Sequence, residues 1–223
     1  MKTIHWIIPI ILSMLLSSCT EEHDLCRQRE EGKIKFNEAQ RQLIPYKKNA
    51  VINFIDMNGN PVDFKVTENK RDWEHWYIFN EESCSDYFLA EEKYTVLSSI
   101  SDDAEITLLM RFHESQWNEE TDQYDGFLRW NGSCGLHIGM ELDYSGKKHY
   151  VTFNSSINQN GDISSENFQE SLEINNHIYH NVFERKENLS VDNRQIPVQL
   201  FYNKAYGILQ IKVNNGNYLM LNL

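Results

Sequence analysis

The sequence predicts an all-β protein, an antiparallel meander that forms a curved sheet or an incomplete barrel, with one short N-terminal helix. Two observations carry this prediction. After Ala50, apolar and polar residues alternate in many short runs, and a period of two places one face of a strand in the core. The runs recur about every 8–12 residues with Gly or Asn between them, as in meanders. Because no long amphipathic run is present, we expect no βαβ unit.

The first predicted elements are a short helix and a hairpin. Asn37 has the side chain of an N-cap, and Gln40, three residues later, completes a capping box. Pro45 ends this helix within two turns. Asn58-Gly59 then predicts the tight turn of a hairpin within residues 51–67, because Asn-Gly readily adopts positive φ angles.

The middle of the chain gives a mixed signal. Residues 71–98 fit a helical and an alternating period equally well, so we expect strand or irregular structure there. Residues 105–112 (EITLLMRF) form a clearer strand. Two further strands are predicted on either side of Ser145-Gly146, between an acidic loop at 113–126 and a polar loop at 154–167.

The last third of the chain shows the clearest alternation. Two strands flank Asn175-Asn176, and three more follow to the chain end: IPVQLFYN, GILQIKV and YLMLNL. Side chains two apart on a strand share a face. We therefore expect two sets of residues to face the core: Ile196, Val198 and Leu200, and then Leu219, Leu221 and Leu223.

Residues 1–18 are predicted to be an export signal. Lys2 precedes an apolar stretch from Trp6 to Leu16. As a helix these residues would span about 16 Å, which is too short for a bilayer core of roughly 30 Å. A basic start, a short apolar core and small residues at the end are typical of a secretory signal.

The residues that end this signal resemble the lipobox of bacterial lipoproteins. Leu16-Ser17-Ser18-Cys19 has the aliphatic, small, small, cysteine order, and the resemblance implies lipid attachment at Cys19 after cleavage before it. Two or three acyl chains anchor a protein stably where one does not. Residues 19–36 would then be a polar, acidic tether, and residues 37–223 a single all-β domain.

The acidic residues after Cys19 bear on the membrane face to which the protein is delivered. Glu21, Glu22 and Asp24 resemble the tag of Bacteroidota-type surface lipoproteins, which implies the outer membrane and its cell-surface face rather than the periplasmic face. Residues 202–223 also resemble the closing strands of secreted β-proteins of that group. That family has no assigned activity, so the resemblance implies no site residue.

The net charge limits the expected binding partners, and the positions of the cysteines limit the expected disulfides. The formal net charge is −12, so we expect no nucleic-acid partner and no attraction to anionic headgroups, and membrane contact rests on the lipid. Since Cys26 lies in the tether, we expect a disulfide between Cys84 and Cys134, whose loop of about 50 residues would stabilise the fold by roughly 4 kcal/mol. The alternative is that all three thiols stay reduced.

No catalytic, metal or cofactor-binding residue is predicted. Asn131-Gly132-Ser133-Cys134-Gly135 lacks the spacing of a nucleophile elbow, and His113 has no second histidine four residues later. Trp117, in the acidic loop, is the predicted ligand contact. We expect a non-catalytic binding or structural role, in which a lipid-anchored envelope protein engages a glycan, an apolar ligand or another envelope protein. The alternative is an exported hydrolase that cleaves a polysaccharide or envelope polymer with a carboxylate pair.

Overall fold

The computed structural model describes residues 30–78, 86–101, 103–112, 117–118, 123–124, 134–144, 146–164, 167–214 and 216–223. Packing divides the described chain into two compact units. The smaller unit contains the described residues 30–33, 75–78 and 86–89. The larger unit contains all described residues within 34–74 and 90–223. The larger unit holds the core and the site described below.

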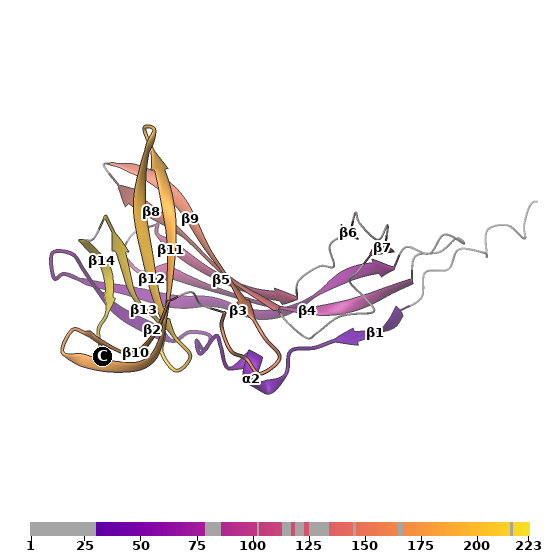
Figure 1. Cartoon of the computed structure of the whole chain (residues 1–223). Helices are drawn as coiled ribbons and strands as arrows, with labels where there is room; N and C mark the ends of the chain where they lie inside the picture. Colours follow the sequence, from indigo (N-terminus) through magenta and orange to yellow (C-terminus); the bar gives the residue numbers. More distant parts are fainter. Residues whose placement is uncertain are drawn as a thin grey trace, which may run out of the picture. The chain divides into compact units, whose positions relative to one another are not determined.

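Strands account for nearly all of the regular structure (Figure 1). In chain order the elements are β1 Glu30–Ile34, α2 Glu38–Arg41, β2 Val51–Asp56, β3 Pro61–Ile78, β4 Asp86–Ser99, β5 Glu105–Phe112, β6 Trp117–Asn118, β7 Gln123–Tyr124, β8 Cys134–Tyr144, β9 Lys147–Ile157, β10 Asn167–Ile174, β11 His177–Val191, β12 Arg194–Asn203, β13 Gly207–Val213 and β14 Gly216–Leu221. Among the described residues, no helix is long and apolar enough to cross a membrane.

One antiparallel sheet contains most of these strands, in the order β10-β11-β12-β13-β14-β2-β3-β4-β5-β8-β9. The predicted all-β fold is therefore confirmed, and the sheet curls into a half-barrel. It consists of two meanders, one from β2 to β9 and one from β10 to β14. They join where the last strand pairs with β2, with Leu221 opposite Phe54 and Leu219 opposite Asp56.

The structure refines several sequence predictions at this level. Strand and irregular structure were both expected within residues 71–98, and the described residues there are strand, in β3 (61–78) and β4 (86–99). The predicted tether contains strand β1, which pairs with β4, and β9 extends to Ile157 into the predicted polar loop. In each case pairing with a neighbouring strand gives the backbone N–H and C=O groups hydrogen-bond partners. This pairing decides the structure where the local sequence preference is weak.

The predicted capping box at the start of α2 is confirmed. The Asn37 side chain accepts from the backbone N–H of Gln40 at 2.9 Å, and the Gln40 side chain accepts from the backbone N–H of Asn37 at 3.1 Å. The helix ends after one turn at Arg41. The helix lies within residues 34–46, which we call the N-terminal segment.

The N-terminal segment packs against both meanders. Phe36 stacks on Phe112 of β5 with ring centroids 4.5 Å apart. On the other side, the hydroxyl of Tyr46 accepts from the N–H of Ile208 at 2.6 Å, and the hydroxyl of Tyr202 donates to the carbonyl of Leu43. Burial raises the pKa of both phenols. The segment thus bridges strands that lie far apart in the sheet.

A buried carboxylate fixes the same segment to β4. Glu91 is 1% exposed, and its carboxylate accepts from the backbone N–H of Phe36 at 3.0 Å. Arg41 and Arg71 lie 3.1 Å and 3.2 Å from its two oxygens. Lys93, two residues on, donates to the carbonyls of Arg41 and Ile44; burial lowers the pKa of its amine.

Strand β9, at one end of the sheet, lies in contact with β11, the second strand from the other end. The side chain of Arg185 reaches from β11 to β9, where Nε donates to the carbonyl of Asn154 at 2.9 Å and to the hydroxyl of Ser155 at 3.0 Å. β9 and β11 are not neighbours in the sheet order. The half-barrel is thus joined at this point through a side chain.

The predicted core faces of the last strands are mostly confirmed. Val198 and Leu200 are buried and Ile196 is half-buried, while Leu219 and Leu221 are 5% and 4% exposed. The prediction for Leu223 was wrong, because β14 ends at Leu221 and the Leu223 side chain is 69% exposed.

Candidate functional site

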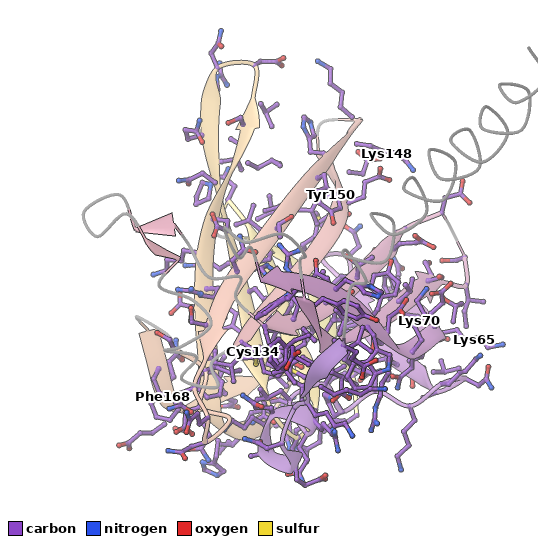
Figure 2. The ribbon with its side chains drawn as sticks, turned by 90° about the vertical axis from the view of Figure 1, so that its right-hand side faces the viewer. Lys65, Lys70, Cys134, Lys148, Tyr150 and Phe168 are labelled. Atoms are coloured by element: carbon purple, nitrogen blue, oxygen red, sulfur yellow. The ribbon has the colours of Figure 1, made fainter. Side chains whose placement is uncertain are left out.

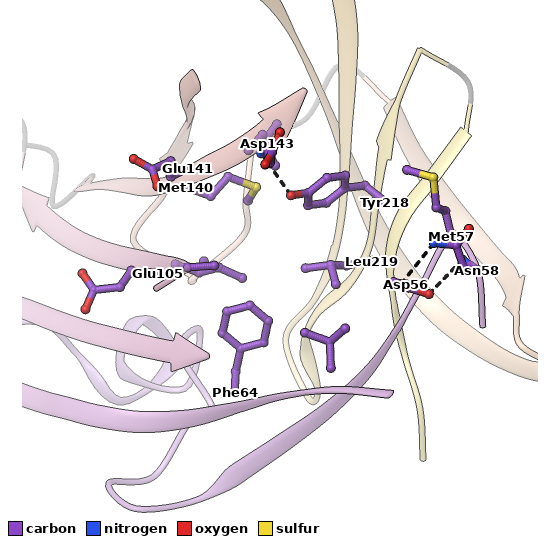
Figure 3. A pocket seen from close by; sticks show the side chains of 14 residues that line it. Asp56, Met57, Asn58, Phe64, Glu105, Met140, Glu141, Asp143, Tyr218 and Leu219 are labelled. Carbon is purple, nitrogen blue, oxygen red and sulfur yellow. Dashed lines mark hydrogen bonds between the residues drawn. The ribbon is translucent and has the colours of Figure 1, made fainter. Parts of the chain in front are cut away.

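The larger unit contains a cleft of about 450 Å³, which we call the half-barrel cleft. It lies between the β2–β3 hairpin, the start of β5, the end of β8 and strand β14 (Figure 3). The residues that line it are Asp56, Met57, Asn58, Val62, Phe64, Ala104, Glu105, Ile106, Met140, Glu141, Leu142, Asp143, Tyr218 and Leu219.

The floor of the cleft is apolar. Strand alternation supplies Val62 and Phe64 from β3, and likewise Met140 and Leu142 from β8, on the inner face of the sheet. Leu219 faces them from β14, and Figure 3 shows Phe64, Met140 and Leu219 around the same space. A concave surface with apolar side chains at its floor and polar groups at its rim is typical of sites that bind small molecules.

One hydrogen bond crosses the cleft. The backbone N–H of Asp143 on β8 donates to the hydroxyl of Tyr218 on β14 at 3.2 Å (Figure 3). The pairing of β5 with β8 stops at Ile106 and Met140, so β8 continues past the end of β5. The N–H of Asp143 therefore has no backbone partner on β5 and donates to the Tyr218 side chain. A polar contact is thus placed above an apolar floor.

Four of the described lining residues are acidic, and none of them is a lysine, arginine or histidine. Figure 3 shows the carboxylates of Glu105 and Glu141 pointing away from the cavity, as the strand alternation requires. Within the described chain Glu141 forms an ion pair, with Lys148 at 2.7 Å. The Asp56 carboxylate accepts from its own turn, from the side chains and backbone N–H groups of Asn58 and Asn60.

These hydrogen bonds lower the pKa of Asp56, chiefly those from Asn60. Asp56 is therefore ionised at neutral pH and would be a poor general acid, because a general acid must hold its proton there. The predicted alternative of a hydrolase with a carboxylate pair stays a prediction. The described residues contain no cluster of three or more His, Cys, Asp and Glu that could hold a metal ion.

The structure brings none of the predicted site residues into the cleft. Cys19, Cys26 and Cys84 lie outside the described residues. Trp117 belongs to the two-residue strand β6, which pairs with β7; its side chain is outside the described part. The predicted ligand contact at Trp117 therefore stays a prediction.

Cys134 is buried at the start of β8 and forms no disulfide with a described residue. Figure 2 places it among packed side chains, whereas Lys65 and Lys148 extend outward. Burial raises the pKa of this thiol to about 12, so it is unreactive as a nucleophile at neutral pH. Because Cys84 lies outside the described residues, the predicted disulfide with Cys134 is not tested and stays a prediction.

Sequence reasoning missed Tyr218 and the cleft around it. In YLMLNL the alternation indicates only that Tyr218 lies on the face opposite Leu219. The pairing of β14 with β2 brings the tyrosine near β8, and no local pattern encodes a pairing between strands about 165 residues apart in sequence.

Comparisons with known proteins add no relative: no protein-family model, no curated protein and no solved structure matches this chain.

Proposed function

We propose that this chain is an exported, lipid-anchored envelope protein that binds a small ligand with an apolar body in the half-barrel cleft. The observation that carries the proposal is the apolar floor of a cleft of about 450 Å³. Sites for small molecules are concave and mostly apolar, with few polar groups. Of the three predicted kinds of partner, an apolar ligand fits this floor better than a glycan or another protein.

The sequence supports the cellular part of the proposal. The lipobox-like residues before Cys19 and the acidic residues after it favour an outer-membrane lipoprotein that faces the cell surface. A protein with a net charge of −12 is repelled by anionic headgroups, so the acyl chains would carry the membrane attachment. The cleft would then be held close to membrane-derived apolar molecules.

Binding of an uncharged fluorescent apolar probe tests the proposal. The full chain carrying Cys19→Ala should be used, so that no attached acyl chain and no detergent compete for the cleft. N-phenyl-1-naphthylamine should bind with an increase in fluorescence. Ala104→Trp should weaken this binding at least about tenfold, because Ala104 is a half-buried lining residue and an indole would fill the space beside the floor.

Ala205→Trp is the matched control. Ala205 is exposed in the turn between β12 and β13, away from the lining residues, so this variant should bind the probe as the parent chain does. The melting temperatures of both variants should be measured, so that loss of folding is distinguished from loss of the site. Absence of probe binding by the folded parent chain, or equal binding by the folded Ala104→Trp variant, would contradict the proposal.

A further inference from the structure

We infer that the ligand of the half-barrel cleft is an uncharged molecule with an apolar body and a hydroxyl or carbonyl oxygen at one end, and that Tyr218 and the backbone N–H of Asp143 recognise that oxygen. This inference rests on the proposed function, because it names the ligand class of the same site. It follows from three features of the cleft, which concern a polar contact, an apolar floor and the surrounding charge.

The first feature is the hydrogen bond between the Asp143 N–H and the Tyr218 hydroxyl, at 3.2 Å. A backbone N–H has one donor, and a phenol both donates and accepts. An oxygen that enters between them can accept from Asp143 and also from the Tyr218 hydroxyl. The pair is therefore suited to receive a hydroxyl or carbonyl oxygen without leaving either protein group unpaired.

The second feature is the contrast between this contact and the floor below it. Phe64 and Met140, which are 2% and 1% exposed, lie at the back of the cleft, and their apolar side chains give little orientation to a ligand. The Tyr218 ring is half-buried and extends across the cleft toward Asp143 (Figure 3). The polar contact would therefore orient the ligand, with its oxygen at the mouth and its apolar body on the floor.

The third feature is the sign of the surrounding charge. Asp56, Glu105, Glu141 and Asp143 are lining residues, and none of the described lining residues is basic. The Glu105 and Glu141 carboxylates point away from the cavity, and Glu141 pairs with Lys148. The charge at the cleft therefore comes chiefly from Asp56 and Asp143. Asp56 is ionised, since hydrogen bonds lower its pKa. An anionic head would be repelled and would leave water without a cationic partner. The cleft therefore selects an uncharged head over a carboxylate on the same chain.

Three amphiphiles that share a ten-carbon chain and differ in the charge of the head group test the predicted head-group preference. Decanol, decanoate and decyltrimethylammonium should be used to displace N-phenyl-1-naphthylamine from the full chain carrying Cys19→Ala, at concentrations below micelle formation. Decanol should displace the probe most effectively, because decyltrimethylammonium has no oxygen to accept from the Asp143 N–H. Decanoate should require at least about a tenfold higher concentration.

Tyr218→Phe tests the recognising residue. This variant keeps the ring and removes the hydroxyl, so decanol should bind about fivefold more weakly, as expected for one neutral hydrogen bond. Binding of the probe itself should not change. Tyr150→Phe is the matched control, because Tyr150 is 65% exposed on β9 and does not line the cleft; decanol should bind this variant as it binds the parent chain.

The outcomes separate this inference from the proposed function. If the probe does not bind the folded parent chain, the proposed function fails. If the probe binds but decanoate or decyltrimethylammonium displaces it as well as decanol does, the inference fails and the proposed function stands. The inference also fails if Tyr218→Phe leaves the affinity for decanol unchanged.

Discussion

Single buried polar residues decide how the N-terminal segment is held. Glu91 contributes a carboxylate that the apolar surroundings would reject if it had no partners. It has three, the N–H of Phe36 and the guanidinium groups of Arg41 and Arg71. The pair with Arg71 is largely open to water, because the Arg71 side chain is 60% exposed. The buried side of the carboxylate therefore depends chiefly on Phe36 and Arg41.

Glu91→Ala should destabilise the fold by roughly 3 kcal/mol. The substitution leaves the N–H of Phe36 and the partly buried Arg41 without their acceptor, and breaking a buried pair from one side is costly. Glu68→Ala is the control, since Glu68 and its partner Lys70 are about half exposed and such pairs contribute little. Urea denaturation measures both, and equal midpoints for the two variants would show that the Glu91 contacts are not stabilising.

At the scale of elements, β14 is the strand that joins the two meanders into one sheet. It pairs with β13 on one side and with β2 on the other, so it connects the C-terminal meander to the N-terminal one. The same strand carries Leu219 and Tyr218 into the half-barrel cleft. Loss of its packing would therefore affect both the core and the site.

Leu221→Ala should lower the free energy of unfolding by about 2–5 kcal/mol, the usual cost of truncating a buried leucine. Leu221 is 4% exposed and lies opposite Phe54. Leu223→Ala, two residues later, should change stability by less than about 0.5 kcal/mol, because that side chain is 69% exposed. Thermal melting of the two variants checks the prediction, which fails if Leu221→Ala melts together with Leu223→Ala.

At the scale of the whole molecule, the predicted anchor precedes strand β1, which leads into the N-terminal segment. Residues 20–29 separate the predicted lipid attachment at Cys19 from this first described strand. The N-terminal segment that follows is held by Glu91, Lys93, Tyr46 and Tyr202.

Cys19→Ala should remove the lipid, because this thiol is the predicted acylation site. In cells grown with labelled palmitate, the parent chain should carry label and fractionate with membranes, whereas the variant should carry none and either become soluble or remain an uncleaved precursor. Cys26→Ala is the control and should keep its label. Labelled palmitate on the Cys19→Ala chain would refute the predicted lipobox.

The sequence alone determined the elements whose causes are local. The Asn37–Gln40 capping box and the turns at Asn58-Gly59 and Asn175-Asn176 follow from side chains and φ preferences within a few residues. The alternating runs in turn predicted the antiparallel all-β fold, because each strand must bury one face. Each of these features is encoded within the segment that forms it.

Tertiary structure alone decided how those elements meet. The pairing of β14 with β2 and the contact from Tyr218 to Asp143 join residues that are far apart in sequence. The long strands within 61–99 include residues 71–98, where local periodicity was ambiguous, and Leu223 continues the alternation although β14 ends at Leu221. In every case the deciding quantity is the free energy of backbone pairing and burial against a distant segment, which no short stretch of sequence contains.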